Sequence, residues 1–585
     1  MTPAEKLRAD LARLGVRRLL LAIHDTSFPS DPDEDVGRGS PATRAADRLF
    51  AYARELGFTG IQLGPQGQTS RSNPSPYDGT IFSRNIANIA VRSMRAGGAF
   101  EGVVDDASIE RWLVPDDGPS RHAHAYDAWH AIVDDAYASL ERGARPDLRE
   151  RLVAFRAEHA SWLVSDALHS AMCHARHSGF RGWDLRDRDV WLAGDGARIA
   201  ELERAHARAI DRYAFGQLLV HDEHVRLRER CDMLLYGDLQ VGYSDADAWA
   251  YAARFLRDYL MGAPPSRTNP EGQPWGYPVL DPDQYNGASR ALVVARADKS
   301  FREYDSLRID HPHGLVCPWV YRADSQDPGL AVREGARLFE SPDLPDHPAL
   351  ARFAIARPDQ LDRALPRHAD HWVRELDDAQ VTQYAILVDT LVAAAELHGR
   401  SKADLSFEVL STMPYPLGRV LARHGLGRWR ITQKADLGNA RDVYRTENAA
   451  REDWVMLGNH DTAPILAVIR GWSAVQREAW ANHLTERLHL ANPARLASDG
   501  FLATAMLAEL FVSPAENVSI FFADLFGYDE RFNLPGVVNS DNWTLRLPPS
   551  FEELHRERLA HERALDLPLA VELALAAQEH GAERR

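Results

Sequence analysis

The sequence predicts an α/β protein, a (β/α)8 barrel of the TIM type with large, mainly helical insertions between its strands. Eight short apolar runs of strand length recur along the 585 residues, and each is followed by a helical connection or an insertion. Several of these runs end in a carboxylate, at the strand end where such barrels carry functional groups. No repeat and no low-complexity linker divides the chain, so we expect residues 1–585 to form a single barrel domain.

The first elements read as strand, helix, strand. An opening helix is expected over residues 3–14, and the apolar run RLLLAIHD follows at 18–25. Apolar residues at helical spacing then indicate a helix over 42–56, before a second short strand in GFTGIQLGP, at 57–65. This order predicts a βαβ unit with parallel strands. Beyond a loop rich in turn formers, residues from about 100 to 230 predict a helical insertion subdomain.

Six further strands follow. A second insertion, with helices and proline-rich loops, is expected from about 322 to 400. The six apolar runs are MLLYGDLQVG at 233–242, SLRID at 306–310, ADLSFEVLS at 403–411, GRWRITQ at 427–433, DWVMLGNHD at 453–461 and NVSIFFADLFG at 517–527.

Composition and charge narrow the class of partner. The chain is 45% hydrophobic and 26% charged, which is ordinary for a globular protein, and its formal net charge is -17. That charge argues against nucleic acid or an anionic membrane surface as the main partner. We expect no membrane span, because no stretch approaches the ~20 apolar residues required. The amphipathic N-terminus does not resemble a signal peptide, and three scattered cysteines favour a reducing, cytoplasmic location.

The stretch SLRIDHPHG, at 306–314, carries the first candidate for chemistry. Arg308 and Asp310 are two residues apart on a strand, so their side chains share one face. The neighbouring cation keeps the carboxylate ionised, as a nucleophile at a strand end requires. A purely structural Arg–Asp pair would give the same pattern.

Other strand ends supply partners for this carboxylate. The strand ends add Glu408, then Asn459, His460 and Asp461, and also Asp238 and Asp524. Retaining glycosidases need two carboxyl groups ~5–5.5 Å apart, one as nucleophile and one as acid/base. Asp310, Glu408 and Asp461 converging on one rim would meet that need. Helix capping or pairing with arginine is the alternative for each acid taken singly.

A metal-dependent hydrolase on the same fold is the competing interpretation. His311 and His313 form an H-x-H pattern, and His460 adjoins Asp461. In RHAHAYDAWH, His122 and His124 are two residues apart and would point to different faces of a helix. We therefore expect no metal site.

With these residues in hand, the chain resembles the 4-α-glucanotransferases, or amylomaltases, of glycoside hydrolase family 77. The similarity runs in order over nearly the whole length, and RIDH and GNHDT match the family's RIDH and GTHDxxT motifs. The longer matching stretches are IQLGPQGQTSRSNPSPYDG, LLYGDLQVGYSDADAWA, GAPPSRTNPEGQPWGYPV and DLFGYDERFNLPGVVNSDNWTLRL.

The resemblance implies a role for each matching residue. Asp310 would be the nucleophile, Glu408 the acid/base and Asp461 the transition-state stabiliser. The implied substrate-binding residues are Arg308, Asp238, His460 and Asn533 around the attacked glucose, Tyr77 with Ser75 against that sugar, and Trp275 by the acceptor groove. The implied reaction uses no cofactor. It takes a maltooligosaccharide or α-glucan donor and a glucose or glucan acceptor, and leaves the oligomeric state open.

The chain also departs from the family pattern near the reacting groups. Val409 and Ser411 stand in FEVLS where the family has AEDLG, and Pro312 and His313 replace Phe and Arg after the nucleophile. Ser244 stands where the family has an Asp. An α-1,4-glucan hydrolase with the same three acids, or a catalytically weak glucan-binding protein, therefore remain alternatives.

Overall fold

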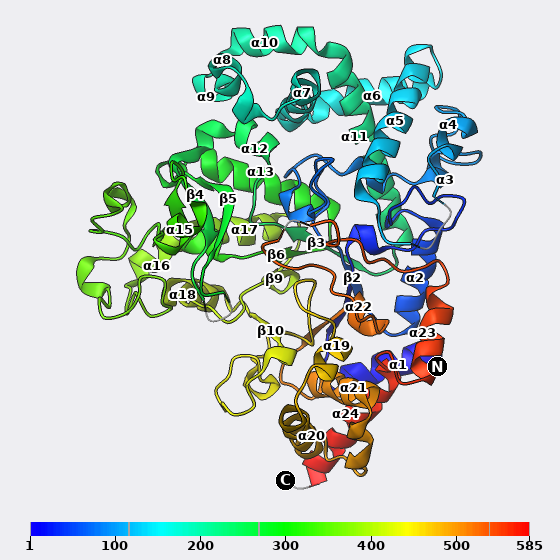
Figure 1. The fold of residues 1–585 in the computed structure, drawn as a ribbon, viewed down its shortest axis with the longest axis vertical. Helices are drawn as coiled ribbons and strands as arrows, with labels where there is room; N and C mark the ends of the chain where they lie inside the picture. Colours follow the sequence, from blue (N-terminus) through cyan, green and yellow to red (C-terminus); the bar gives the residue numbers. More distant parts are fainter. Residues whose placement is uncertain (1, 115–117, 267–268, 538, 584–585) are drawn as a thin grey trace.

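The computed structural model describes residues 2–114, 118–266, 269–537 and 539–583, and its centre is a sheet of eight parallel strands (Figure 1). All eight lie in the runs that the sequence marks as strands. They are β1 (Arg18–Ala22), β2 (Gly60–Gln62), β3 (Leu234–Leu239), β6 (Ser306–Ile309), β9 (Leu405–Phe407), β10 (Trp429–Ile431), β11 (Trp454–Met456) and β12 (Asn517–Phe521).

The sheet closes on itself to form the barrel. Its strand order is β10-β11-β12-β1-β2-β3-β6-β9, so the two edges are β9 and β10. At this seam the backbone N–H of Trp429 donates to the carbonyl of Val409 over 3.2 Å. The indole N–H of Trp429 donates to Ser406 Oγ over 2.7 Å. The nearly closed barrel confirms the predicted fold class.

Apolar side chains pack on both faces of the strands. Leu19 and Leu21 of β1 join the large core between the sheet and the surrounding helices. Leu20, which points the other way, belongs to a second cluster with Tyr236, Trp429, Ile431, Tyr444, Trp454 and Met456. Large buried side chains on successive strands thus fill the barrel interior, as in other TIM barrels.

Helices surround the barrel. The helix expected at 42–56 is α2 (Arg44–Glu55), which starts where Thr43 Oγ1 accepts from the N–H of Ala46. The others around the barrel are α1 (Pro3–Arg13), α12 (Asp245–Ala250), α13 (Ala288–Glu303), α14 (His313–Val316), α17 (Ile386–Leu397), α18 (Tyr415–His424), α19 (Ile465–Arg470), α20 (Ala474–Leu488), α21 (Asp499–Phe511), α22 (Phe522–Leu525), α23 (Phe551–Ala560) and α24 (Leu567–Glu583). Among the described residues, none of the helices is long and apolar enough to cross a membrane.

A group of helices between β2 and β3 forms a lobe of its own, of which α5 to α11 are drawn in cyan and blue-green in the upper part of Figure 1. Its members are α3 (Val91–Met94), α4 (Asp106–Glu110), α5 (His122–Glu141), α6 (Pro146–Glu158), α7 (Ala160–Arg176), α8 (Leu185–Arg188), α9 (Val190–Ala193), α10 (Gly196–Ala205) and α11 (Ala207–Arg230).

A second, antiparallel sheet was not predicted. Its order is β5-β4-β7-β8, built from β4 (Phe255–Ala263), β5 (Gln273–Leu280), β7 (Trp319–Arg322) and β8 (Ala336–Arg337), with α15 (Pro328–Arg333) and α16 (Asp378–Tyr384) nearby. The sequence hides β5 because Pro274, Gly276 and Pro278 interrupt it, and these residue types normally mark loops. β4 and β5 pair as an antiparallel hairpin, which Figure 1 draws to the left of the barrel strands β2, β3 and β6.

Candidate active site

Four polar side chains at the carboxyl ends of the strands converge on one arginine. Arg308 of β6 is 1% exposed. Its Nη1 donates to Asp238 over 2.5 Å and to the hydroxyl of Tyr77 over 3.1 Å. Its Nη2 donates to Asp310 over 3.1 Å and to Glu408 over 2.5 Å. A single buried cation therefore fixes three carboxyl groups from three neighbouring strands.

Strand register explains this convergence. Asp238 of β3 pairs with Arg308 of β6, and Ile309 pairs with Phe407 of β9. The N–H of Glu408 donates to the carbonyl of Ile309 over 3.0 Å, so Glu408 and Asp310 leave adjacent strands at the same level. The sequence predicts the strands, but only the register places these side chains side by side.

Asp310 is held as a carboxylate. Its Oδ2 accepts from the N–H of Val241 over 3.1 Å, and its Oδ1 lies 2.9 Å from Nδ1 of His311. Burial alone would raise its pKa, but the charges of His311 and Arg308 outweigh burial and hold the pKa below its usual range. An ionised, buried carboxylate at a strand end suits a nucleophile.

His311 is a site residue whose role sequence reasoning did not identify. Burial opposes its charge, but the carboxylates of Asp310 and Glu408 raise its pKa to about 9. Its backbone has φ of 39°, in the left-handed region that non-glycine residues seldom occupy. The histidine thus adds a second cation beside the two acids, at a strained position directly after the strand.

The pKa of Glu408 is shifted in the opposite direction to that of Asp310. Burial raises its pKa to about 7, against the lowering effect of Arg308 and His311. One oxygen of Glu408 and one of Asp310 lie within 4.8 Å of each other. A carboxylic acid protonated near neutral pH beside an ionised carboxylate can protonate a leaving group while its partner attacks.

The third acid approaches from β11. Asp461 Oδ1 accepts from the side-chain amide of Asn533 over 2.6 Å and lies 3.5 Å from Nε2 of His460. The N–H of Asp461 donates to the side chain of Asn459 over 3.1 Å, and Asn459 also faces Glu408 at 3.5 Å. These contacts place Asp461 on the same rim as the acid pair.

Aromatic rings line the remaining side of the site. Tyr77 and His460 stack at 5.2 Å with their planes 18° apart. Trp543 packs 5.8 Å from Tyr77, and His24, at the end of β1, lies 5.0 Å from His460. Neither His24 nor Trp543 was assigned a role from the sequence, although His24 lies at a strand end, where such residues are expected.

The other predicted binding residues flank this centre. Trp275 of β5 packs edge-on against His311, with ring centroids 5.2 Å apart. Ser75 precedes the short turn that holds Tyr77, and its N–H donates to the side chain of Asn73 over 3.0 Å. Asp524, the acid at the end of β12, instead accepts from the N–H of Ile465 over 2.7 Å, at the start of α19.

The histidines weighed as metal ligands separate into different environments. Nε2 of His313 lies 3.0 Å from the carbonyl of Thr412, whereas His311 faces the acids. His122 and His124 contact the carbonyls of Ser70 and Trp112. Asp310, His311 and Glu408 are spaced closely enough to hold a cation, but the guanidinium of Arg308 already donates to both carboxylates.

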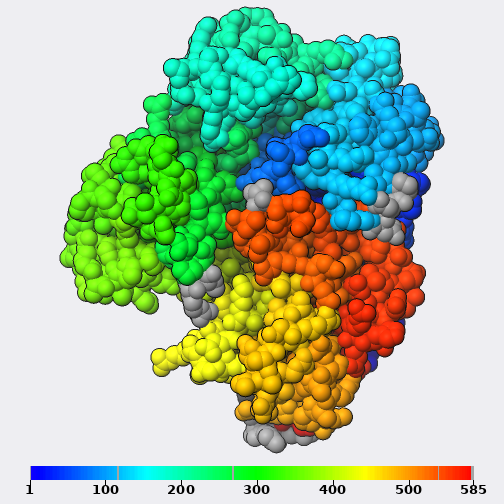
Figure 2. Space-filling view, in the orientation of Figure 1, coloured from blue at the N-terminus to red at the C-terminus, as the bar shows by residue number. Residues whose placement is uncertain are grey.

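A polar cavity of about 560 Å3 is lined by Ser411 and Thr412, which follow Glu408 by three and four residues in the sequence. It lies where Figure 2 shows a notch between the green lobe that holds β4 and the yellow segment near residues 436–450. Ser411, one of the departures from the family motif, is in its wall. The other lining residues include Pro265, His368, Asp370, Thr412, Asn439 and Arg441. Residues 267–268 of the GAPPSRTNP motif and residue 538 lie outside the described residues.

Fold and site together define a class of protein. A (β/α)8 barrel that carries two neighbouring carboxyl groups with different pKa values at its strand ends is typical of enzymes that process carbohydrates. The chain belongs to glycoside hydrolase family 77, whose model, described as 4-alpha-glucanotransferase, matches residues 23–552. This match confirms the resemblance seen in the sequence.

Known proteins of this family share about a quarter of the matched residues. The chain is 24% identical over 347 residues to a chloroplastic/amyloplastic 4-alpha-glucanotransferase of Solanum tuberosum, covering 56% of this chain and 57% of the relative. It is 26% identical over 323 residues to the 4-alpha-glucanotransferase of Thermus thermophilus, covering 51% and 59%. The matched part of the chain thus spans somewhat over half the length of each of these two relatives.

Solved structures show the same fold. The amylomaltase from Streptococcus agalactiae, solved in complex with acarbose, superposes with a TM-score of 0.70 at 18% identity, over 94% of this chain and 100% of that one. The amylomaltase from Corynebacterium glutamicum gives 0.63 at 18% identity, over 97% and 76%.

Proposed function

We propose that this protein is a 4-alpha-glucanotransferase that transfers α-1,4-glucan segments to the 4-hydroxyl of an acceptor glucose or glucan with net retention. The observation that carries the proposal is the pair Asp310 and Glu408. One carboxyl oxygen of each lies no more than 4.8 Å from the other, so the two groups are closer together than the ~6.5–9.5 Å that inverting enzymes need for a water between them. Their pKa values shift in opposite directions.

In the first step, Asp310 attacks the anomeric carbon of the donor while Glu408 protonates the departing glycosidic oxygen. The bond to the leaving sugar breaks and a covalent glucosyl ester on Asp310 forms. Asp461, held by Asn533, faces the ring as positive charge develops on it.

In the second step, Glu408 removes the proton from the 4-hydroxyl of an acceptor, which attacks the ester and releases Asp310. The polar cavity beside Ser411 and Thr412 is the place we assign to this acceptor. Its amide, carboxylate and guanidinium groups suit sugar hydroxyls. Transfer exceeds hydrolysis when a bound acceptor keeps water out of this space.

The donor sugar would lie against the aromatic side of the site. Tyr77 and His460 offer a flat, stacked surface, and burial lowers the pKa of His460 to about 4, so that its ring is neutral. Arg308 and Asp238 supply polar atoms at the base of that surface. Trp275, beside His311, would mark the border with the acceptor side. Ser75 would bond the sugar next to Tyr77.

We also infer that the substrate is a cytoplasmic maltodextrin. The cysteines of the described residues, Cys173, Cys231 and Cys317, form no disulfide, as expected in a reducing compartment. Fractionating cells of the source organism and assaying maltotriose conversion in each fraction tests this inference, because activity confined to a secreted fraction would contradict it.

Product analysis on maltotriose tests the proposed reaction. Wild type should yield glucose together with oligosaccharides longer than maltotriose. Asp310→Asn should abolish both products, and Glu408→Gln should slow them by about 10²–10⁴-fold, the usual contribution of general acid–base catalysis. Asp404→Asn is the matched control, because this acid directly precedes β9 and pairs with Arg18 at the amino ends of the strands, away from the site, and it should remain active.

Two outcomes would replace the proposal. Products that only shorten would make the protein an α-glucan hydrolase with the same residues. Binding of maltooligosaccharide by wild type without any turnover would make it a glucan-binding protein.

A further inference from the structure

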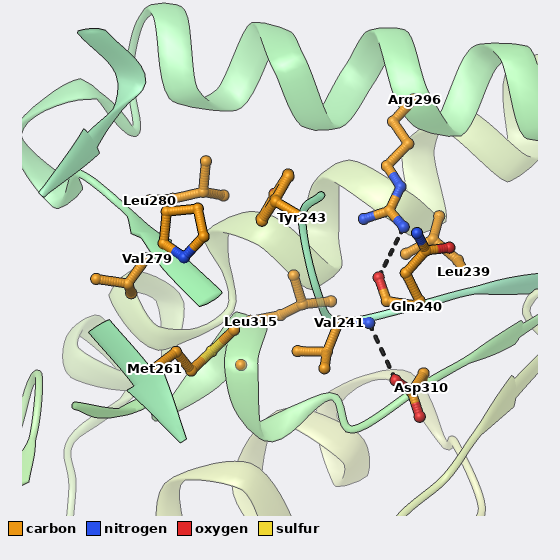
Figure 3. Close-up of a pocket in the computed structure, with 12 residues that line it drawn as sticks. Leu239, Gln240, Val241, Tyr243, Met261, Val279, Leu280, Arg296, Asp310 and Leu315 are labelled. Atoms are coloured by element: carbon orange, nitrogen blue, oxygen red, sulfur yellow. Dashed lines mark hydrogen bonds between the residues drawn. The ribbon is translucent and has the colours of Figure 1, made fainter. Parts of the chain in front are cut away.

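Behind the nucleophile, on the face away from Glu408, lies a buried arginine that the proposed mechanism does not use. Arg296 of α13 is 7% exposed, and it lines the same small cavity, of about 20 Å3, as Asp310 (Figure 3). Within the described part of the chain, no carboxylate forms an ion pair with Arg296. Burying a guanidinium without a carboxylate partner costs free energy of folding, so a functional role for Arg296 is a reasonable expectation.

The contacts of Arg296 lead to Asp310 through a single peptide group. Nη2 of Arg296 donates to the carbonyl oxygen of Gln240 over 2.7 Å. The N–H of Val241, in the same peptide group, donates to Oδ2 of Asp310 over 3.1 Å. Figure 3 shows both hydrogen bonds, one on each side of this peptide.

We propose that Arg296 is a positioning residue for the nucleophile, and that it acts through the Gln240–Val241 peptide group, which we call the peptide relay. A cation at the carbonyl end of a peptide withdraws electron density and strengthens the N–H at the other end as a donor. The relay therefore fixes and stabilises the attacking carboxylate from behind, while Arg308 holds its other oxygen.

The surroundings keep the relay in place. A Cβ built on Gly314 would lie 2.4 Å from the side chain of Val241, so the turn after the nucleophile packs directly on the relay. A Cβ on Gly242 would lie 2.6 Å from the ring of Tyr277, which closes the other side. The side chain of Gln240 also donates to the carbonyl of Gly79 over 2.8 Å, next to the turn that carries Tyr77.

Covalent labelling measures the nucleophile separately from the acceptor. A 5-fluoro-α-glucosyl fluoride probe would be attacked by Asp310 at the anomeric carbon. The C–F bond breaks, fluoride leaves, and an ester to Asp310 remains, which intact-mass measurement follows with time. Departure of fluoride needs little help from an acid, so the labelling rate reports on the placement of Asp310.

The variants are Arg296→Met, Arg296→Lys and the matched control Arg290→Met. Arg290 lies on the same helix, and its Nε donates to Thr390 Oγ1 on α17, outside the relay. Arg296→Met should label about tenfold to a hundredfold more slowly than wild type, the range expected for a misplaced reacting group. Arg290→Met should match wild type, and Arg296→Lys, which can still donate to Gln240, should recover part of the rate.

Each outcome has a distinct meaning. Equal labelling of Arg296→Met and Arg290→Met overturns the relay while leaving the transfer reaction intact. The inference rests on the proposed function, so failure of wild type to label at Asp310 would defeat that function first. If Arg296→Met melts far below Arg290→Met, the Arg296→Lys variant decides: labelling faster than that of Arg296→Met supports the relay, and labelling no faster than that of Arg296→Met overturns it.

Discussion

At the scale of single residues, the site separates two chemically similar acids by their neighbours. Asp310 faces His311, Arg308 and the N–H of Val241, so its charged form is favoured. Glu408 shares Arg308, but burial dominates and favours its neutral form. The sequence places one carboxyl group at the end of each of these two strands. It cannot show that their pKa values differ, because the contacts that shift the pKa values come from residues distant in the chain.

The pH dependence of turnover should reflect the carboxyl group of Glu408. Since its pKa is raised to about 7, the protonated form needed for bond cleavage is present below that pH and is lost above it. With maltotriose, kcat/KM should therefore fall about tenfold for each pH unit above about 7. With an α-glucosyl fluoride donor, whose leaving group needs no proton, the alkaline fall should be much weaker. A maltotriose profile that stays flat to pH 9 would contradict the acid role.

At the scale of elements, the turn that carries Tyr77 is tied to the helical lobe. Ser83 donates to Asp166 of α7 over 2.6 Å, and the N–H of Ile81 donates to Asp247 of α12 over 3.4 Å. Burial, and then the charge of Asp247, raises the pKa of Asp166 to about 8. The lobe thus supports this segment through the buried carboxyl group of Asp166, and α12 supports it through Asp247.

Replacing Asp166 should make stability less dependent on pH. In the unfolded chain this carboxyl ionises above about pH 4, whereas in the folded protein it stays protonated to about pH 8. Folding therefore loses stability between those pH values, and the loss is complete above the higher one. Asp166→Asn should raise the melting temperature relative to wild type by a few degrees at pH 9 and have no such effect at pH 4.

Asp187 is the control for this measurement, because its pKa is shifted in the opposite direction. Hydrogen bonds, first from Arg198, lower the pKa of Asp187 to about 2. Asp187→Asn should then destabilise the protein above pH 4, with the difference shrinking as the pH falls toward 2. A uniform effect of Asp166→Asn at all pH values would show that the carboxyl does not titrate as inferred.

At the scale of the whole molecule, the sequence was sufficient for the barrel and for the acids on its rim, but not for what covers them. Apolar runs such as RLLLAI, at 18–23, identify parallel strands because both faces of a barrel strand are buried. The β4–β5 hairpin was not predicted, because its prolines and glycines are typical of a loop. This hairpin brings Trp275 to the site. His24 and Trp543 reach the site only through tertiary packing.

Two distant segments meet above the acids. Gln273, at the start of β5, lies beside Gly536, where a built Cβ would come within 3.3 Å of its side-chain nitrogen. Asn533 of the same loop contacts Asp461, and Trp275 of the same strand contacts His311. The hairpin and the 533–537 loop therefore form a bridge from one side of the site to the other.

Weakening this bridge should favour long substrates. Gln273→Ala removes the side chain beside Gly536, so the ratio of kcat/KM for amylose to that for maltotriose should rise by about twofold to fivefold, equivalent to roughly 0.5–1 kcal/mol. Gln284→Ala is the control, because Gln284 donates to the carbonyl of Ala253, at the other end of the hairpin. An unchanged ratio would mean that glucans do not pass beneath the bridge.

The seam between β9 and β10 has a consequence for motion. The other neighbouring strands of the barrel are joined by a series of backbone hydrogen bonds. At this seam, the backbone hydrogen bond among the described residues is the one from Trp429 to Val409. Fewer backbone bonds mean a lower free energy for local opening. Amide hydrogens at the seam should then exchange with solvent sooner than those of β6, which pairs with a neighbouring strand along both of its edges. The barrel should therefore open to solvent first between β9 and β10, while the β6 end that carries Asp310 stays closed longest.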